Sequence, residues 1–183
     1  MQYEKLLDQC KKNDSKAQRA LYDHFKNGLM GLCRRYTRSR EDAQDVLQDA
    51  FIKIFLKINQ LESHEKLGGW VKSVTVRTAI DHYHKKRKQE QNYSETEYNV
   101  PDLDSDLALE NLTDEYLITI INELPDGCRI VFNLFEVEGY SHAEISDLLR
   151  ITEGTSRSQL HHAKLLLKQK LNALGVKRYE KFA

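Results

Sequence analysis

The chain has 183 residues, with 28 Lys and Arg balanced by 28 Asp and Glu. This length accommodates one ordinary domain or two small ones with modest cores. Two Pro and eight Gly leave few turn signals for strands, and three cysteines without CxxC spacing indicate neither a disulfide framework nor a zinc site. No apolar stretch approaches 18 residues and the first 14 residues are polar, so we expect a soluble, cytoplasmic protein without membrane insertion.

The zero net charge hides three blocks. Residues 1–88 carry 19 Lys and Arg against 11 acidic residues, residues 89–128 carry 11 acidic residues and no Lys or Arg, and residues 129–183 carry 9 against 6. Two basic blocks therefore flank an acidic one. The basic ends suit phosphates and the acidic middle suits a basic partner surface, although blocks of charge can also be ordinary solvated faces.

Two amphipathic helices are predicted first in the chain. Asp14 is placed to cap a helix over 15–37, in which apolar residues recur at helical spacing. Ser39 opens a second helix that reaches residue 58, with Asp42 in a capping-box-like position. The polar flank of this second helix consists of Asp42, Asp45, Gln48 and Asp49.

A third helix is predicted over 70–88. The glycine-containing segment 60–69 interrupts the helical pattern, and the β-branched run from Val71 to Ile80 resembles a strand. Spacings of three and four among Trp70, Val74 and Arg77 favour a helix that leads into a basic tail. Residues 89–109 have low hydrophobicity and only negative charge, and are predicted to be a flexible linker.

The remaining helices are expected over 109–124, ending at Pro125, and over about 128–138. Ser141 with Glu144 then predicts a capping box on a short helix, and the next helix begins after Thr152. The three-to-four-residue connection between them is typical of a helix-turn-helix. Ala143, Ile145, Leu148, Leu149 and Ile151 are expected to pack on Leu160, Ala163, Leu166 and Leu167.

A polar, cationic stripe is left on the outer face of the second helix of this motif. Arg, Gln and Ser can hydrogen-bond base edges in the major groove, and Lys can neutralise phosphate. A solvated helix face would also be polar, but the short-turned, capped partner helix favours DNA. The candidate residues are Arg157, Ser158, Gln159, His161, His162, Lys164 and Lys168.

Three segments in this order resemble the extracytoplasmic-function (ECF) sigma factors of the sigma-70 family. DAQDVLQDAFIKIF at 42–55 is similar to the helix of conserved region two, and WVKSVTVRTAIDHYHKKRK at 70–88 to the helix that follows it. SHAEISDLLRITEGTSRSQLHHAK at 141–164 is similar to the region-four helix-turn-helix. The resemblance covers nearly the whole chain and implies an all-α protein of two small helical domains joined by a flexible acidic linker.

The resemblance also implies partners and roles. Residues 1–88 would bind core RNA polymerase and melt the minus-10 element, residues 89–109 would thread the basic RNA-exit path of the polymerase, and residues 110–183 would read the minus-35 element of promoter DNA. Polymerase would be bound by Asp42, Asp45, Gln48, Asp49 and Lys53. Ile52 beside them is apolar at a position that faces outward with Asp45 and Asp49, which also favours a partner-binding face. The melted strand would be held by Ser63, His64, Lys66, Lys72, Ser73, Arg77, His84, Lys85, Lys86, Arg87 and Lys88. Family members often bind an anti-sigma protein, although nothing in this sequence identifies one.

Several positions depart from the family pattern, and two of them, Gln159 and His162, leave the promoter sequence unpredictable. The departures are Arg77, His84, Ser146, Ser156, Gln159 and His162. The packing skeleton is unaffected.

The sequence also bears on two other classes of function, an enzyme and a dimeric regulator. Neither His82 with His84 nor His161 with His162 has the spacing of a helical metal site, and no Gly-rich phosphate loop or nucleophile elbow occurs. We therefore expect no enzyme, no metal and no cofactor. A dimeric helix-turn-helix regulator with an amino-terminal sensor is the other candidate, but it has no need of a second basic helix ending in KKRK.

Overall fold

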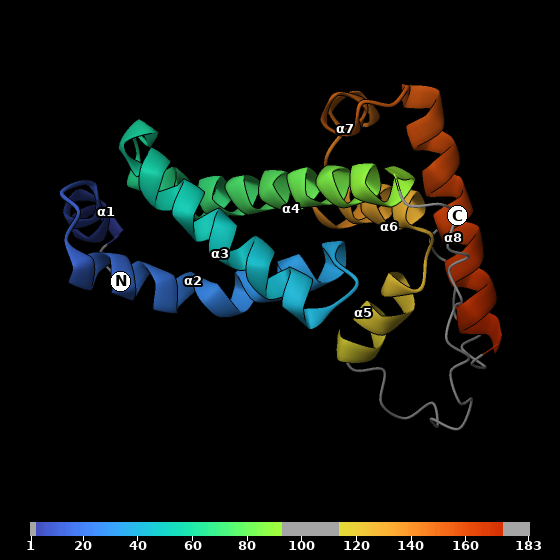
Figure 1. The fold of residues 1–183 in the computed structure, drawn as a ribbon, viewed down its shortest axis with the longest axis horizontal. Helices are drawn as coiled ribbons and strands as arrows, with labels where there is room; N and C mark the ends of the chain where they lie inside the picture. The colour runs from blue at the N-terminus through green and yellow to red at the C-terminus, as the bar shows by residue number, and fades with distance from the viewer. Residues whose placement is uncertain (1–2, 93–113, 174–183) are drawn as a thin grey trace. The chain divides into compact units, whose positions relative to one another are not determined.

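Helices account for the regular structure in the part of the chain described by this computed structural model, residues 3–92 and 114–173 (Figure 1). No strand occurs within those two ranges, so the predicted all-α class is confirmed. The chain divides into two compact units, Met1–Asn92 and Tyr93–Ala183.

The first unit is built on three mutually packed helices, α2 (Ser15–Tyr36), α3 (Arg40–Lys57) and α4 (Leu67–Asn92). Both predicted caps are present: the Asp14 carboxylate accepts from Ala17 N at 2.8 Å, and Ser39 Oγ accepts from Asp42 N at 3.0 Å. The apolar stripes meet in a core whose fully buried members include Leu21, Val46, Ile54, Val71 and Val76. Burying each such side chain contributes about 1.5–3 kcal/mol to the stability of the fold. This free energy holds the three helices together.

A short first helix, α1 (Tyr3–Lys11), was not predicted. It buries Leu6, Leu7 and Cys10 and packs on α2 and beside the turns η1 (Ile58–Gln60) and η2 (His64–Lys66). The pattern of three apolar residues spaced one and three apart was present, but nine residues are too few to give a strong periodic signal. The segment 60–69, where the helical pattern was expected to break, thus consists in part of short helical turns rather than open loop.

Helix α4 confirms the helical interpretation of the β-branched run. Thr75 and Thr78 donate their hydroxyls to the carbonyls of Val71 and Val74 at 2.9 and 2.8 Å, so both side chains are satisfied inside the helix. The helix begins at Leu67, earlier than predicted, and continues to Asn92. The rest of the predicted linker, 93–109, lies outside the described residues.

The second unit comprises α5 (Asp114–Asn122), α6 (Asp126–Phe132), a π-helical segment η3 (Asn133–Val137), α7 (His142–Leu149) and α8 (Glu153–Ala173). The single helix expected over 128–138 is interrupted, because Glu138 N donates to Asn133 O at 2.9 Å across five residues. The three-residue connection Arg150–Thr152 between α7 and α8 confirms the predicted helix-turn-helix.

The packing expected within the helix-turn-helix is partly wrong. Ala143 is exposed. Ala163 and Leu167 belong to a cluster with Ile120 of α5, Leu124 of the turn after α5 and Cys128 of α6, against which Leu166 also packs. The reason is length, because α8 has 21 residues and α7 only eight. The carboxyl-terminal half of α8 extends beyond α7 and is buried by α5 and α6 instead.

Candidate polymerase and promoter interfaces

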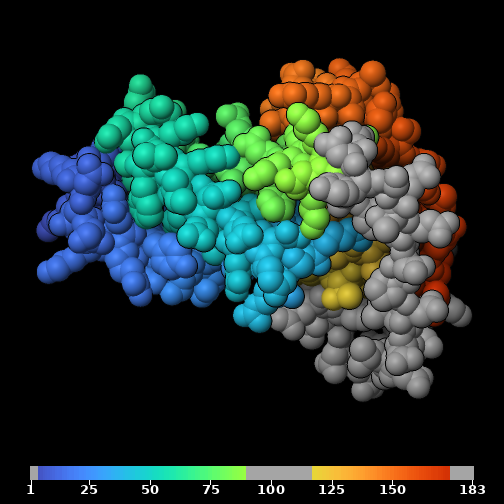
Figure 2. All heavy atoms as spheres, in the orientation of Figure 1, coloured from blue at the N-terminus to red at the C-terminus, as the bar shows by residue number. Residues whose placement is uncertain are grey.

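One face of α3 is open and carries both acidic and apolar side chains. Asp45, Asp49 and Ile52 recur at spacings of four and three, and Gln48 lies beside them; all four are exposed. The surface of α3 faces the viewer in Figure 2. Leu56 continues the stripe and is 75% exposed, compared with 51% for Ile52. Exposed large apolar side chains at one helical spacing are typical of a partner-binding surface.

Leu56 was missed by the sequence reasoning. Its spacing of four from Ile52 was the available signal. An apolar residue near the end of a helix can equally well be a buried core residue, so this signal was ambiguous. We call Asp45, Gln48, Asp49, Ile52 and Leu56 the α3 face.

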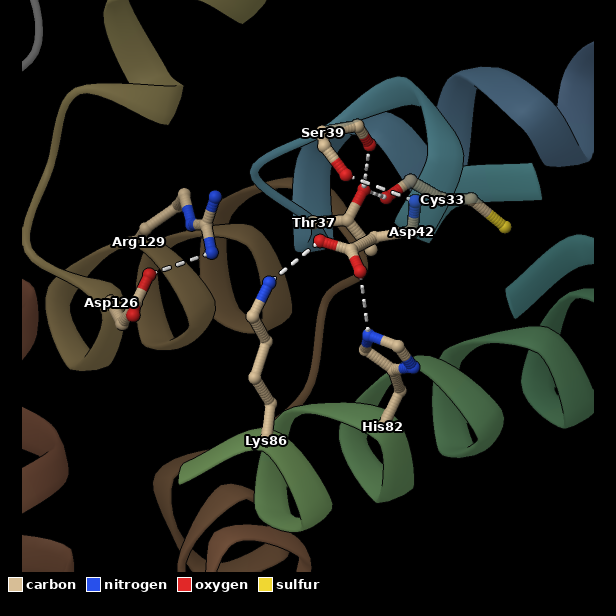
Figure 3. Close-up of polar contacts among 8 residues, drawn as sticks. All are labelled: Cys33, Thr37, Ser39, Asp42, His82, Lys86, Asp126 and Arg129. Carbon is tan, nitrogen blue, oxygen red and sulfur yellow. Dashed lines mark hydrogen bonds and ion pairs between the residues drawn. The ribbon is translucent and has the colours of Figure 1, made fainter. Parts of the chain in front are cut away.

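Asp42 and Lys53 are not on the α3 face but are tied to α4. Figure 3 shows Asp42 between α4 residues Lys86 and His82: Lys86 Nζ lies 2.8 Å from Oδ2, and His82 Nε2 lies 3.5 Å from Oδ1. Lys53 Nζ lies 2.9 Å from Asp81 Oδ2. Two of the six polymerase candidates, together with the DNA candidate Lys86, are therefore engaged within the unit.

These contacts change the titration of Asp42. Partial burial raises the pKa of the carboxyl group, but hydrogen bonds with Lys86 and Ser39 and the charges of Lys86 and His82 outweigh it and hold the pKa below its ordinary value. A depressed folded-state pKa stabilises the fold above the unfolded-state pKa. That contribution is lost as the pH falls through the folded-state value.

We expect Asp42→Asn to lower the free energy of unfolding by about 0.5–1 kcal/mol at neutral pH, because a partly exposed ion pair and a favourable charge near the α3 amino terminus are lost. The difference should shrink as the pH falls below the ordinary range of a carboxyl group and through the depressed folded-state pKa of Asp42, where the wild-type side chain becomes neutral. Urea unfolding of both proteins over a pH series measures it. A difference that stays constant with pH would contradict the assigned role of the ionised carboxylate.

The candidates for strand melting fall into separate groups. Ser63 and His64 are half-buried beside Lys66 in the turn before α4, while Lys72, Ser73 and Arg77 follow in its first half. His84 is half-buried, and Lys85, Arg87 and Lys88 are exposed in its last turns. At 1.5 Å per residue, Lys66 and Lys88 lie about 30 Å apart. The first group and the basic tail therefore cannot share one pocket, and a nucleic acid that meets both must follow the length of α4.

In the second unit, capping hydrogen bonds fix where α7 and α8 begin. The Ser141 hydroxyl and the Glu144 carboxylate form the predicted capping box, with Ser141 N donating to Glu144 Oε2 at 2.8 Å. This lowers the pKa of Glu144. Arg150 adopts the left-handed conformation at φ 54°, and Thr152 Oγ1 accepts from Thr155 N at 3.0 Å to begin α8.

A further link between the two helices was missed. His142 Nδ1 lies 2.8 Å from the fully buried Ser156 Oγ, and the His142 ring stacks on Phe135 at a centroid distance of 4.5 Å. Ser156 was noted only as a departure from the family pattern. A serine at a position where the family pattern has a valine was the available signal, because a hydroxyl that takes a core position needs a hydrogen-bond partner.

The cationic stripe of α8 is on the surface. Exposed members are Arg157, Ser158, His161, His162, Lys164 and Lys168. Two of the cations have acidic neighbours, since Arg157 lies 2.6 Å from Glu153 and Lys164 lies 2.7 Å from Glu136. Gln159 is half-buried instead, because its amide lies over Gly127, where an added Cβ would be 2.6 Å from Nε2.

The histidine and cysteine side chains form no ligand cluster in the part of the chain that the structure describes. Cys10, Cys33 and Cys128 are buried thiols, and burial raises the pKa of Cys33 to about 12. Cys128 Sγ lies 3.8 Å from His162 Nδ1. Burial raises the pKa of the Cys128 thiol as well. These thiols behave as core side chains.

Comparison with known proteins follows the same division. Residues 21–89 match the Sigma-70 region 2 family model, and residues 114–167 match the Sigma-70 region 4 model. The chain is 25% identical to the RNA polymerase sigma-H factor of Pseudomonas aeruginosa over 94% of its own length and 95% of the relative's. It is 26% identical to the ECF RNA polymerase sigma factor SigW of Bacillus subtilis, over 95% and 99%. The chain is an ECF member of the sigma-70 family.

Solved structures agree on the fold of this sigma factor. The sigma factor RpoE, crystallised with the anti-sigma factor NepR from Bartonella quintana, matches 87% of this chain and 98% of its own with a TM-score of 0.55 at 18% identity. CnrH, solved with the cytosolic domain of CnrY, matches 92% and 96% with a TM-score of 0.50 at 17% identity.

As an ECF sigma factor, the protein directs RNA polymerase to promoter DNA and initiates transcription. This function sets aside the dimeric regulator considered from the sequence.

Within the described ranges, no helix combines the length and hydropathy needed to cross a bilayer.

Proposed function

We propose that the two units divide promoter-directed initiation between them. Residues 1–88 bind core RNA polymerase through the α3 face and hold the opened minus-10 element along α4, and residues 110–183 read the minus-35 element with α8. The observation that carries the proposal is the α3 face, where Ile52 and Leu56 are 51% and 75% exposed and continue the stripe that Asp45 and Asp49 begin. In a folded unit with a complete apolar core, such side chains are best explained by a partner.

Strand opening needs no chemical step in this proposal, and the protein acts in the cytoplasm as a non-catalytic initiation factor. The unpaired strand is captured by phosphate contacts and base stacking, which contribute roughly 1–3 kcal/mol per stacked base. The acidic segment 89–109, with no Lys or Arg, follows the basic RNA-exit path of the polymerase.

We also propose that an anti-sigma protein can bind this chain and compete with polymerase for the α3 face. Support comes from the two solved structures of similar fold, which are complexes of CnrH with CnrY and of RpoE with NepR. The exposed apolar residues of the α3 face are available to any such partner.

The direct test mixes the purified full chain with sigma-free core RNA polymerase and separates the mixture by gel filtration. We expect the chain to co-elute with polymerase and the resulting holoenzyme to start transcription in a run-off assay on promoters found by genomic mapping. A chain that elutes alone would contradict the assignment of the α3 face.

A further inference from the structure

His142 joins three elements of the second unit. It is the first residue of α7, and its Nδ1 forms a 2.8 Å hydrogen bond with Oγ of Ser156 on α8. The His142 ring also stacks on Phe135 of the π-helical segment η3, with 4.5 Å between the ring centroids and 23° between the ring planes. Because Ser156 is fully buried, water does not compete for its hydroxyl.

The hydrogen bond lies at the end of α7 that is remote from the turn of the helix-turn-helix. This turn, Arg150–Thr152, connects the carboxyl end of α7 to the amino end of α8 (Figure 1). His142 is seven residues before Leu149, the last residue of α7, which corresponds to about 10 Å along the helix axis. The turn therefore fixes one end of α7 on α8, and the hydrogen bond between His142 and Ser156 fixes the other end.

This hydrogen bond differs in kind from the apolar contacts of the two helices. Ile145 and Leu149 of α7 and Leu160 of α8 are buried, and the hydrophobic effect that buries them has no preferred direction. A hydrogen bond, in contrast, constrains both a distance and an angle. The family pattern has a valine at position 156, which fills a core position without such a constraint. The serine of this chain therefore adds a directional contact between α7 and α8.

Fold stability alone gives no reason for a serine at this position. A valine would bury more apolar surface, whereas the buried hydroxyl of Ser156 must first give up its hydrogen bonds to water. A buried polar pair whose hydrogen bond is made specifies one arrangement of the elements that carry it. The geometry between α7 and α8 is therefore the property that the pair of His142 and Ser156 controls.

We propose that His142 and Ser156 are positioning residues for promoter recognition, which fix the arrangement of α7 on the recognition helix α8. Neither side chain is assigned a contact with DNA. In a helix-turn-helix the first helix crosses the DNA backbone while the second enters the major groove, so the arrangement of the two helices decides whether both contacts form together. The stacking on Phe135 holds the His142 ring in place for the hydrogen bond. The proposal rests on the proposed reading of the minus-35 element by α8.

The test compares two substitutions of nearly equal shape, Ser156→Thr, which keeps the hydroxyl, and Ser156→Val, which removes it. Each full-length variant is combined with core polymerase, and the affinity of the holoenzyme is measured for a mapped promoter with its minus-35 element intact or substituted. The ratio of the two affinities is the discrimination. One hydrogen bond corresponds to a change of roughly 2- to 12-fold in the population of the binding-competent arrangement. We expect Ser156→Val to lose discrimination by a factor in this range and Ser156→Thr to keep the wild-type value.

His142→Phe tests the same contact from its other side, because it keeps an aromatic ring against Phe135 but has no Nδ1. Combined with Ser156→Val, it should lose no more discrimination than either single variant, since one hydrogen bond can be lost only once. The matched control is Ser146→Val, which removes a hydroxyl that donates within α7 to the carbonyl of Ala143 at 2.7 Å. This control should keep the wild-type discrimination.

Urea unfolding and co-elution with core polymerase accompany each measurement, because a merely structural role would lower stability and leave the discrimination of the folded protein unchanged. Equal discrimination by Ser156→Val and Ser156→Thr, or additive losses in the double variant, would overturn the proposal. If Ser156→Val does not fold, His142→Phe decides the outcome: wild-type discrimination overturns the proposal and reduced discrimination supports it. A wild-type holoenzyme that binds both promoters equally would overturn the proposed reading of the minus-35 element by α8, and this inference with it.

Discussion

Asp45→Arg combined with Asp49→Arg is expected to abolish association with core RNA polymerase. The two substitutions reverse the charge of the α3 face beside Ile52 and Leu56, and like charges across an interface cost several kcal/mol. A loss of about 3 kcal/mol already weakens binding by roughly 100-fold. Gel filtration of the variant with sigma-free core polymerase should show separate peaks, and titration of labelled protein into polymerase gives the magnitude.

The fold of this variant should be intact, since both positions are exposed on the middle turns of α3. Circular dichroism should show the wild-type spectrum, with a change in unfolding free energy within about 0.5 kcal/mol. Asp8→Arg with Glu62→Arg serves as the matched control, because it makes the same charge change at exposed positions outside α3. If the control loses polymerase equally, net charge rather than the α3 face is responsible.

Local signals in the sequence were enough to predict most of the secondary structure. Asp14, Ser39, Ser141 and Thr152 all cap the helices expected of them, because capping depends on neighbours two or three residues away. The helical period also predicted correctly that α4 would be a helix despite its β-branched residues. These features involve only short stretches of chain, so a single sequence carries them.

Contacts between distant residues were beyond the same reasoning. Asp42 and Lys86 are 44 residues apart, and each was predicted to serve a different partner, yet they bind each other. Leu166 and Leu167 were expected to pack on α7 because it precedes α8 directly, but α5 and α6 cover them. The same polar residues occupy the exposed and the half-buried positions of an amphipathic helix, so the sequence does not tell the two kinds of position apart. Only the packed structure distinguishes half-buried Asp42 from exposed Asp45.

Arg157→Ala and His161→Ala are expected to weaken binding to the distal promoter element while sparing association with polymerase. Both side chains are exposed on the amino-terminal half of α8, the part of a recognition helix that meets base edges. A base contact of this kind contributes about 1–3 kcal/mol, so each variant should weaken binding by roughly 5- to 150-fold. The measurement uses reconstituted holoenzyme on a promoter found by genomic mapping, with co-elution with core polymerase as the second readout.

Arg157 needs a control for its intrahelical ion pair, since Arg157→Ala also removes the 2.6 Å contact with Glu153. Glu153→Gln weakens that pair but keeps the guanidinium, and an exposed pair of this type contributes only about 0.3–0.5 kcal/mol to the helix. If Arg157 contacts DNA, Glu153→Gln should bind the promoter at least as well as the wild type, because the arginine is no longer competed for by a carboxylate. Equal losses in Arg157→Ala and Glu153→Gln would assign Arg157 to helix stability and leave promoter recognition to the remaining stripe.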